Sequence, residues 1–465
     1  MGRIAREGTD RLTGTESSLP PHQIGVEEAA LTRNLDPRDP QGATTRNGRS
    51  QHGVANGSDA AVLGLRAWTR DNGTTFVIGR LATTFYDISA AAWASIGIGG
   101  TTGERFRAEP LADTLVIVVD GLAPQKFTGG ANSALGGTPP SEAKYAAIFV
   151  SKVWLAGDDS NPQTKTFSAT NNPENYTAAN DAGSITTQDG GGDTIRGLVA
   201  TRKALYTFYR NFTDVLYGDS VFNFREERLI NKGLVSLTGY ATTGEVSFFA
   251  SDDAIYMTAG TRVSDITSLA IRKTYQDISD KSKITLGVKG DLLLVVDYGS
   301  DLAYAFDYKR GVWRTWNGQP WVVLDTANDQ TFYAGTDGGS TTQVWKIDTG
   351  SLDGAATVTA IWRTPNLGYG WPDAIKNLAA LKVHAKPGIG TVTVTYLKNG
   401  ATTGSATDLS FASTGSNDWA GRHGQRAIRG HYLALEFQWV GVGTLYGWAA
   451  YAEITADADQ IPLEA

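Results

Sequence analysis

Short apolar stretches, each bounded by turn residues, fill the chain between about residues 60 and 350. Leu65–Trp68 and Phe76–Ile78 flank Asp71-Asn72-Gly73, and an Asn-Gly turn between two such stretches is typical of a β-hairpin. Further stretches of this kind are Thr114–Val119, Ala204–Phe208 and Leu292–Val296. No sustained helical spacing of apolar residues accompanies them, so the pattern predicts an all-β fold.

A loose module recurs within this region. It consists of a strand, a tight Gly or Asp turn, a second strand, and a closing strand that bears Trp or Tyr. Examples are Thr75–Trp93, Lys203–Tyr217 and Asp291–Trp316. Modules repeated about every 40–50 residues are typical of β-propeller blades. At that spacing the region of about 290 residues predicts roughly six blades.

The flanking regions have different patterns. Pro and Gly are dense before residue 59, as in Asp36–Pro40 and Arg46–Arg49, and they interrupt any long helix. After residue 350 the predicted strands lengthen, and Leu433, Leu435 and Phe437 alternate with other residues as in a half-buried strand. We therefore expect an extended N-terminal arm over 1–58, a β-propeller over 59–350 and a C-terminal β-sandwich over 351–465.

The composition excludes several classes of protein. The 465 residues include 12 Trp, 18 Tyr and 16 Phe, which is enough apolar area to rule out disorder of the whole chain. There is no Cys, so disulfides, thiolate metal sites and a cysteine nucleophile are excluded. From the sequence we expect no catalytic residue, no cofactor and no metal site.

The charge pattern argues against tight binding to nucleic acid. Lys and Arg total 41 and Asp and Glu total 48, a net charge of −7, and no basic patch stands out. An acidic stretch over 158–193 and an acidic C-terminal tail carry part of the excess. The apolar runs fall short of the roughly 20 residues of a membrane helix, and no signal peptide is evident. We expect synthesis in the cytoplasm and no membrane segment.

One motif points to a possible chemistry. Thr69-Arg70-Asp71-Asn72-Gly73-Thr74-Thr75-Phe76 fits the Asp-box of sialidase-like propellers, in which the Asp accepts backbone N–H bonds and the aromatic packs inside the blade. Thr336–Gly339 is a partial echo. The box is a structural hairpin even in sialidases. Sialidase chemistry needs in addition a tyrosine nucleophile and an arginine cluster on the substrate carboxylate.

Three other groups of residues have a chemical and a structural interpretation. Gln188–Asp193 has carboxylates suited to calcium but lacks the spacing of a calcium loop, which favours a polar loop. His423 and His431 have no acidic residue between them to orient an imidazole, which favours surface histidines. Six tryptophans could stack sugars or bases but are expected to pack between sheets: Trp154, Trp313, Trp316, Trp321, Trp345 and Trp439.

Several segments, in their order along the chain, resemble the propeller-type tail hub, or nozzle, of short-tailed bacteriophages, also called the packaged-DNA stabilisation protein. These segments are Asn34–Pro37 with Arg46–Arg49, Tyr145–Leu155, Thr166–Ser168, Asn172–Tyr176, Ile195–Leu198, Leu205–Phe208, Val215–Gly218, Val246–Tyr256, Leu292–Asp297, Tyr304–Tyr308 and Trp313–Trp316. The resemblance covers most of residues 34–350 and, more loosely, the C-terminal sandwich.

The resemblance implies a structural virion protein. It implies a homohexameric ring in the tail, below the portal and adaptor proteins and near fibre or needle proteins, which continues the channel for double-stranded DNA and helps retain the genome until ejection. An acidic wall would let a polyanion slide rather than stick. A receptor- or glycan-binding propeller is the alternative, followed by a sialidase-like glycoside hydrolase.

Overall fold

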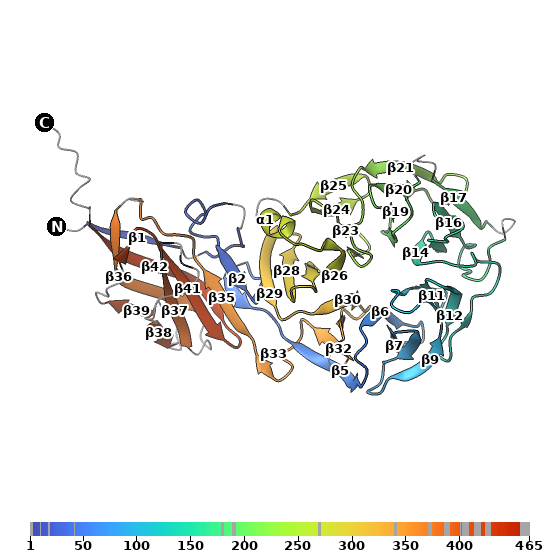
Figure 1. The fold of residues 1–465 in the computed structure, drawn as a ribbon, viewed down its shortest axis with the longest axis horizontal. Coiled ribbons are helices and arrows are strands. Elements are labelled where there is room, and N and C mark those ends of the chain that lie inside the picture. The colour runs from blue at the N-terminus through green and yellow to red at the C-terminus, as the bar shows by residue number, and fades with distance from the viewer. Residues whose placement is uncertain are drawn as a thin grey trace.

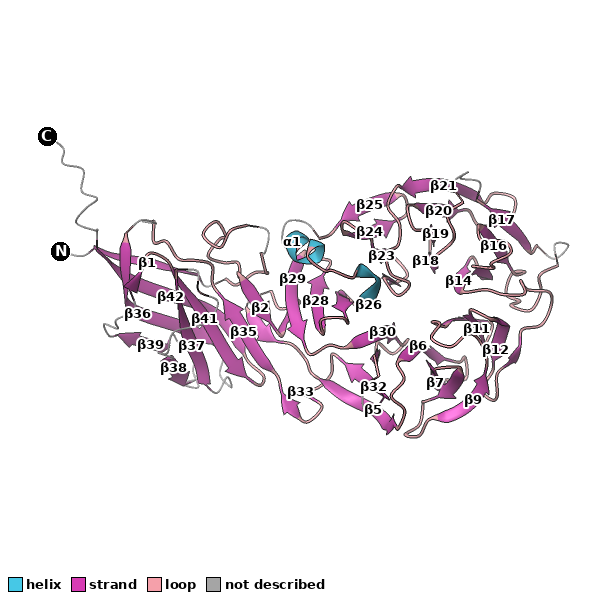
Figure 2. Ribbon diagram, in the orientation of Figure 1, coloured by secondary structure: helices cyan, strands magenta, loops and turns pink. Residues whose placement is uncertain are grey.

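The computed structural model describes residues 3–9, 11–16, 19–40, 42–177, 181–187, 192–267, 271–338, 342–370, 374–385, 391–399, 401, 409–412, 420–423 and 429–455. Within these ranges the regular secondary structure is almost wholly strand, joined by turns and loops (Figure 2). The two helical segments, α1 (Arg272–Gln276) and the 3-10 turn η2 (Lys281–Lys283), are both far too short to span a bilayer. The all-β prediction is confirmed.

Seven antiparallel sheets form the blades of a β-propeller in the described part of the chain (Figure 1). From the axis outward, the first four blades are β6 (Val62–Thr69), β7 (Thr75–Leu81), β8 (Thr84–Asp87) and β9 (Ala94–Ile98); β10 (Arg107–Leu111), β11 (Thr114–Val119), β12 (Leu122–Phe127) and β13 (Ser133–Ala134); β14 (Tyr145–Phe149), β15 (Lys152–Ala156), β16 (Thr164–Phe167) and β17 (Gly183–Thr186); and β18 (Gly197–Ala200), β19 (Leu205–Phe208), β20 (Thr213–Tyr217) and β21 (Arg225–Ile230). The last three are β22 (Tyr240–Thr242), β23 (Ser247–Ala250), β24 (Ile255–Ala259) and β25 (Arg262–Asp265); β26 (Ile284–Lys289), β27 (Leu292–Asp297), β28 (Leu302–Asp307) and β29 (Val312–Asn317); and β30 (Trp321–Thr326), β31 (Phe332–Thr336), β32 (Thr342–Ile347) and β5 (Arg49–Asn56).

The hydrophobic core of the propeller lies between the blades. Seven apolar clusters each join side chains of two neighbouring blades, including the pair formed by the seventh and first blades. A middle strand such as β27 is therefore buried along its whole length, because a blade packs against both faces. The outer strand β21, with the sequence Arg-Glu-Glu-Arg-Leu-Ile, is largely exposed. This division explains why apolar runs in the sequence alternate with polar strands.

The segment before residue 59, predicted to be an extended arm, instead supplies strands to both parts of the molecule. β5 pairs with β32 and is the outermost of the four main strands of the seventh blade. β1 (Arg3–Thr9), β2 (Leu31–Arg33), β3 (Leu35–Asp36) and β4 (Ala43–Thr45) join the sandwich. Pro and Gly interrupt helices, as predicted, but β1, β2 and β4 between them pair with strands more than 300 residues away in sequence.

The contribution of β5 also bears on the number of blades. A repeat of about 40–50 residues predicts roughly six blades, whereas the described residues form seven. β6 begins at Val62 and β32 ends at Ile347. Seven blades fit between these residues, so the average repeat lies at the short end of the range assumed from the sequence. Because the fourth strand of the seventh blade comes from the N-terminal segment, the last blade needs fewer residues of the central region.

The C-terminal residues form a sandwich of two sheets, as predicted, together with strands of the N-terminal segment. One sheet has the order β3-β4-β42-β36-β39, with β1 also on β42 and β40 on β36; the other has the order β2-β35-β41-β37-β38. The C-terminal strands are β35 (Thr359–Arg363), β36 (Ile375–Ala385), β37 (Thr391–Lys398), β38 (Leu409–Ala412), β39 (Ala420–His423), β40 (Arg429–Gly430), β41 (Leu433–Val440) and β42 (Thr444–Thr455). Leu433, Leu435 and Phe437 are all buried in the shared core, which confirms the sandwich strand expected there.

The sandwich and the propeller meet along β29 of the sixth blade (Figure 1). The indole Nε1 of Trp316 donates to the carbonyl oxygen of Leu35 at 2.7 Å, and the backbone N–H of Asn34 donates to the carbonyl oxygen of Thr315 at 2.6 Å. The small hairpin of β33 (Leu352–Asp353) and β34 (Ala356–Thr357) leads the chain back from the seventh blade into the sandwich. The polypeptide thus crosses the junction in both directions.

Candidate functional site

The innermost strands of all seven blades surround a cavity of about 260 Å³ on the propeller axis. Arg107, Ala108 and Glu109 of β10 all line this cavity. By the alternation of a strand Arg107 and Glu109 lie on one face of the blade, whereas the side chain of Ala108 packs in the core between the first and second blades. Arg66 of β6 and Asp325 of β30 reach the cavity from the first and seventh blades. Four charged side chains therefore line one part of its wall.

Arg66 joins the two carboxylates. Its Nη2 lies 2.8 Å from Glu109 Oε2 and its Nη1 lies 3.3 Å from Asp325 Oδ1. Burial raises the pKa of Glu109 and that of Asp325, and the attraction of Arg66 offsets only part of this effect. About a quarter of the Arg66 and Glu109 side-chain surface is still accessible, and because both residues line the cavity we assign that surface to it.

Arg107 bridges the axis from the second blade to the fifth. Its Nε donates to the hydroxyl oxygen of Tyr240 at 3.0 Å, and its Nη2 donates to the carbonyl oxygen of Leu237, just before β22. Its Nη1 donates to its neighbour, the carbonyl oxygen of Phe106, at 3.0 Å. All three acceptors are uncharged, so no described carboxylate neutralises this guanidinium directly.

The part of the wall formed by the third and fourth blades is apolar. The lining residues there are Ala146, Ala147, Ile148, Leu198, Val199 and Ala200. Threonines of the fifth to seventh blades connect neighbouring inner strands, as in the 2.8 Å contact between the hydroxyls of Thr238 and Thr285. The cavity is thus charged along one arc and apolar along the other.

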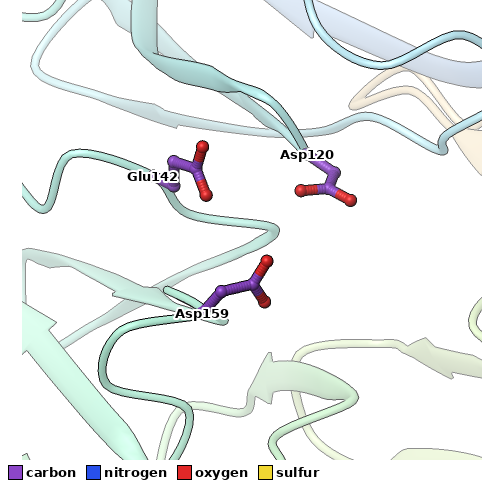
Figure 3. A group of neighbouring side chains, drawn as sticks. All are labelled: Asp120, Glu142 and Asp159. Atoms are coloured by element: carbon purple, nitrogen blue, oxygen red, sulfur yellow. The ribbon is translucent and has the colours of Figure 1, made fainter.

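A second cluster consists of carboxylates at the edge of the second and third blades. Asp120, Glu142 and Asp159 place one oxygen each within 4.8 Å of the others (Figure 3). The ammonium of Lys144 lies 2.7 Å from Asp159 Oδ1 and 3.3 Å from Asp120 Oδ1. Burial alone would lower the pKa of Lys144, but these two carboxylates outweigh it and raise the pKa. The lysine thus supplies a cation where a metal ion would bind.

The Asp-box residues form the hairpin between β6 and β7, as predicted, with Gly73 at φ +84°. Phe76 packs inside the blade against Trp68 and Phe127, with ring centroids 5.8 and 5.2 Å away. The side chain that accepts a backbone bond is that of Asn72, from the N–H of Thr74 at 3.0 Å, rather than that of Asp71. The prediction for Asp71 is wrong because the neighbouring amide closes this turn.

The candidate calcium loop is described only in part, since residues 188–191 lie outside the described ranges. The carboxylate of Asp193 accepts bonds from the backbone N–H groups of Thr194, Arg210 and Asn211. Asp193 therefore holds the turn between β19 and β20. Of the partial echo, Gly339 lies outside the described residues, and Thr336 ends β31.

The tryptophans and histidines stand mostly in structural positions. Five of the six tryptophans are fully buried, namely Trp154, Trp313, Trp316, Trp321 and Trp439, whereas Trp345 is half-buried under the guanidinium of Arg49 at 4.9 Å. The expectation that they pack between sheets is met for these five. His431 is half-buried, and its backbone N–H donates to Asn399 Oδ1 at 2.9 Å; the side chain of His423 lies outside the described part of the chain.

None of the axial residues was predicted from the sequence. Arg66, Arg107, Glu109, Tyr240 and Asp325 come from four blades and lie far apart in the chain. The sequence does contain one indication of the site. Arg107 and Glu109 are charged residues that alternate with Ala108 in the first strand of a module, which is typical of a strand with one polar face. Convergence of these residues on one axis depends on how the blades are arranged in the ring, which a single sequence does not reveal.

Comparison with known proteins identifies no relative in sequence. No family model matches the chain, and no curated protein matches it. The solved structures that it is similar to include the Pan2 WD40 domain of Neurospora crassa (11% identity, 66% of this chain and 97% of that one, TM-score 0.42). BamB of Moraxella catarrhalis has 12% identity over 68% of this chain and 94% of that one, with a TM-score of 0.39.

A third similar structure is the extracellular domain of a putative one-component system from B. thetaiotaomicron, with 12% identity and a TM-score of 0.45. The match covers 63% of this chain and only 39% of that one, so the chain spans well under half of its length. The sheet topology and the positions of the seven inter-blade cores establish on their own that the chain contains a β-propeller, here joined to a β-sandwich.

Proposed function

We propose that the chain is a non-catalytic structural protein of the tail of a short-tailed bacteriophage, where copies of it form a ring below the portal and adaptor. The single observation that carries this proposal is the way the N-terminal segment unites the two domains. Strands of residues 3–45 lie in the sandwich, and the next strand, β5, completes the seventh blade. Such a unit suits the subunit of a ring. The two surfaces through which a subunit contacts its neighbours in the ring must keep a fixed orientation to each other.

Charged contacts reinforce the junction. Arg46, only 1% exposed, pairs with Asp353 at 2.5 Å, and Arg38 pairs with Asp348 at 2.6 Å. Both arginines belong to the N-terminal segment, and both carboxylates follow the seventh blade. Ion pairs that are largely withdrawn from water fix an orientation, because separating them leaves a charge without a partner.

In this proposal the DNA passes along the axis of the ring, between subunits. The axis of a single propeller holds a cavity of about 260 Å³, the size of a small-ligand site, and Arg107 bridges it. The major groove of duplex DNA alone is about 12 Å wide, so a duplex cannot follow that path.

Several carboxylates of the acidic stretch are paired with lysines, so the stretch carries less unbalanced negative charge than its composition suggests. Glu174 pairs with Lys126 at 2.7 Å, and Asp181 pairs with Lys152 at 2.9 Å. Asp159 is bound by Lys144. These pairs reduce the local field, so a weak repulsion of DNA by the net charge of −7 fits the proposal better than a strongly acidic wall.

The test is assembly. The purified full chain is studied by light scattering and electron microscopy, alone and with rings of the adaptor protein of the same phage. We expect a closed ring, hexameric according to the family resemblance, either alone or on the adaptor. A chain that stays monomeric in both conditions refutes the proposal.

A sialidase-like activity ranks behind a binding propeller among the alternatives, but one observation favours it: the axial cavity brings together the residue types such chemistry uses. Arg66, Arg107, Glu109 and Tyr240 all line it. However, the Tyr240 hydroxyl oxygen accepts a bond from Arg107, and none of its described contacts is with a carboxylate that could activate it as a nucleophile. Turnover of fluorogenic sialosides that disappears in Tyr240→Phe would favour this activity over the structural role.

A further inference from the structure

We propose that the axial cavity is a binding site for a small apolar α-amino acid, held as a zwitterion between Glu109 and Arg107. This function is independent of ring assembly. Three features of the cavity support this site: the unused bonding capacity of these two side chains, their position on one strand and the apolar arc that faces them.

Glu109 offers an acceptor for an ammonium group. Its Oε2 is bound by Arg66, whereas no described donor reaches its Oε1. Asp325 shares Arg66 at 3.3 Å and accepts the backbone N–H of Ala67 at 2.6 Å. Two carboxylates thus face one guanidinium, so this end of the charged arc has an excess of negative charge that a ligand cation would balance.

Arg107 offers donors for a carboxylate. A guanidinium carries five N–H groups, and the three bonds that Arg107 makes go to the uncharged oxygens of Tyr240, Phe106 and Leu237. An ionised acceptor forms a stronger bond to such a group than an uncharged one. With two cationic and two anionic side chains in the lining, a zwitterion keeps the cavity neutral, whereas a lone cation or anion does not.

The two charged side chains stand on the same strand of the cavity wall. Arg107 and Glu109 are two residues apart on β10 and point to the same side, so their Cα atoms are about 6.6 Å apart at a rise of about 3.3 Å per residue. The ammonium and the carboxylate of an α-amino acid sit on one carbon, and a charge-assisted bond of about 2.8 Å extends each of them toward its partner. Both side chains line the same cavity, so a molecule within it lies between the carboxylate of Glu109 and the guanidinium of Arg107.

The apolar arc determines the kind of side chain. Ala146, Ile148 and Ala200 line the cavity on the third and fourth blades. A volume of about 260 Å³ lies just below the range of about 300–1,000 Å³ for drug-sized ligands. An aliphatic side chain fits this arc, because its burial there removes apolar area from water.

The first experiment measures binding to the full chain by calorimetry, with L-leucine and L-valine as probes. Isoamylamine lacks the carboxylate of leucine, and isocaproate lacks its ammonium. We expect saturable binding of at least one amino acid and binding at least about tenfold weaker for both analogues. Absence of binding by both amino acids, or binding of an analogue as tight as that of leucine, overturns the proposal.

Variants locate the site. We expect Glu109→Gln to weaken binding at least about tenfold, whereas Glu245→Gln, at an exposed ion pair with Arg202, leaves it unchanged. Ala200→Leu fills the apolar arc without altering a charged group and is expected to abolish binding while the ring still assembles. Thermal unfolding and circular dichroism establish that each variant is folded. Should Glu109→Gln fail to fold, Ala200→Leu decides the question, and unchanged affinity in that variant overturns the proposal.

Discussion

At the scale of single residues, Arg314 is a buried charge with little compensation. It lies on β29 at the junction with the sandwich and is 1% exposed. Its Nη2 donates to the carbonyl oxygen of Gly42 at 3.2 Å, but Nε and Nη1 have no described partner. Burial lowers its pKa to about 10, although Asp36 and Asp39 attract it from a distance. Stacking at 5.2 Å over the ring of Trp362 accounts for its position.

We predict that Arg314→Met leaves the free energy of unfolding unchanged or raises it by up to about 2 kcal/mol, because an apolar side chain needs no counter-charge there. Arg46→Met is the matched variant. It should cost about 3 kcal/mol, since the carboxylate of Asp353 loses its partner. Urea unfolding of both variants measures the difference. A loss of equal size in both would mean that the charge of Arg314 is compensated.

Glu7 connects pH to the docking of β1. Burial raises the pKa of Glu7, although the backbone N–H of Tyr369, at 2.5 Å, and the charge of Lys376 act against this. An acid whose folded-state pKa is raised binds more protons in the folded state, so its contribution to stability is lost as pH rises through that window. We predict that Glu7→Gln is at least as stable as wild type at pH 7 and that its relative advantage disappears at about pH 4. Unfolding at several pH values tests this, and an advantage that grows on acidification contradicts it.

At the scale of elements, the start of β5 is a tight crossing. Gly48 lies just before β5, and a Cβ at this position would be 2.0 Å from the carbonyl oxygen of Leu352 in β33. The clashing atoms belong to the backbone of Leu352, which cannot move aside as a flexible side chain can, so the two strands would have to separate. Gly57, just after β5, has nothing within 4 Å of such a Cβ. The two ends of one strand therefore differ sharply in the room they leave for a side chain.

We predict that Gly48→Ala lowers the free energy of unfolding by about 1–3 kcal/mol through this overpacking. Gly57→Ala should be neutral or should stabilise the fold by up to about 1 kcal/mol, because it restricts the unfolded chain. Chemical unfolding of the two variants provides the comparison. Equal stability of both would mean that β5 does not press against β33 in solution.

The sequence predicted elements that depend on neighbours along the chain and missed those that depend on distant partners. The hairpin at Asp71-Asn72-Gly73 and the buried run of β27 follow from local turn chemistry and apolar pattern. The polar strand β5 has no such pattern, and only its pairing with β32 makes it a strand. The same reason accounts for the axial site, since Arg66 and Asp325 meet only when the first and seventh blades close the ring.

At the scale of the whole molecule, Asp348 connects the two domains. Its carboxylate accepts bonds from Arg38 of the N-terminal segment, at 2.6 Å, and from Lys289 of the sixth blade, 3.0 Å away. Burial would raise the pKa of Asp348, but Arg38 and Lys289 outweigh this and lower it. Because the folded-state pKa of this acid is depressed, its contribution is present at neutral pH and is lost as pH falls through that value.

We predict that the propeller and sandwich of the wild type unfold in one transition at neutral pH, and that Asp348→Asn separates this into two. Asn keeps the shape and tolerates the φ of +55° at this position, while Lys289 loses its counter-charge and Arg38 keeps only Asp36, at a cost of about 3 kcal/mol. Scanning calorimetry records the transitions. Asp291→Asn, at an exposed pair with Lys309, serves as the control and should leave a single unshifted transition. A single unshifted transition in Asp348→Asn as well would mean that the strand connections alone, without this charge cluster, make the two domains unfold together.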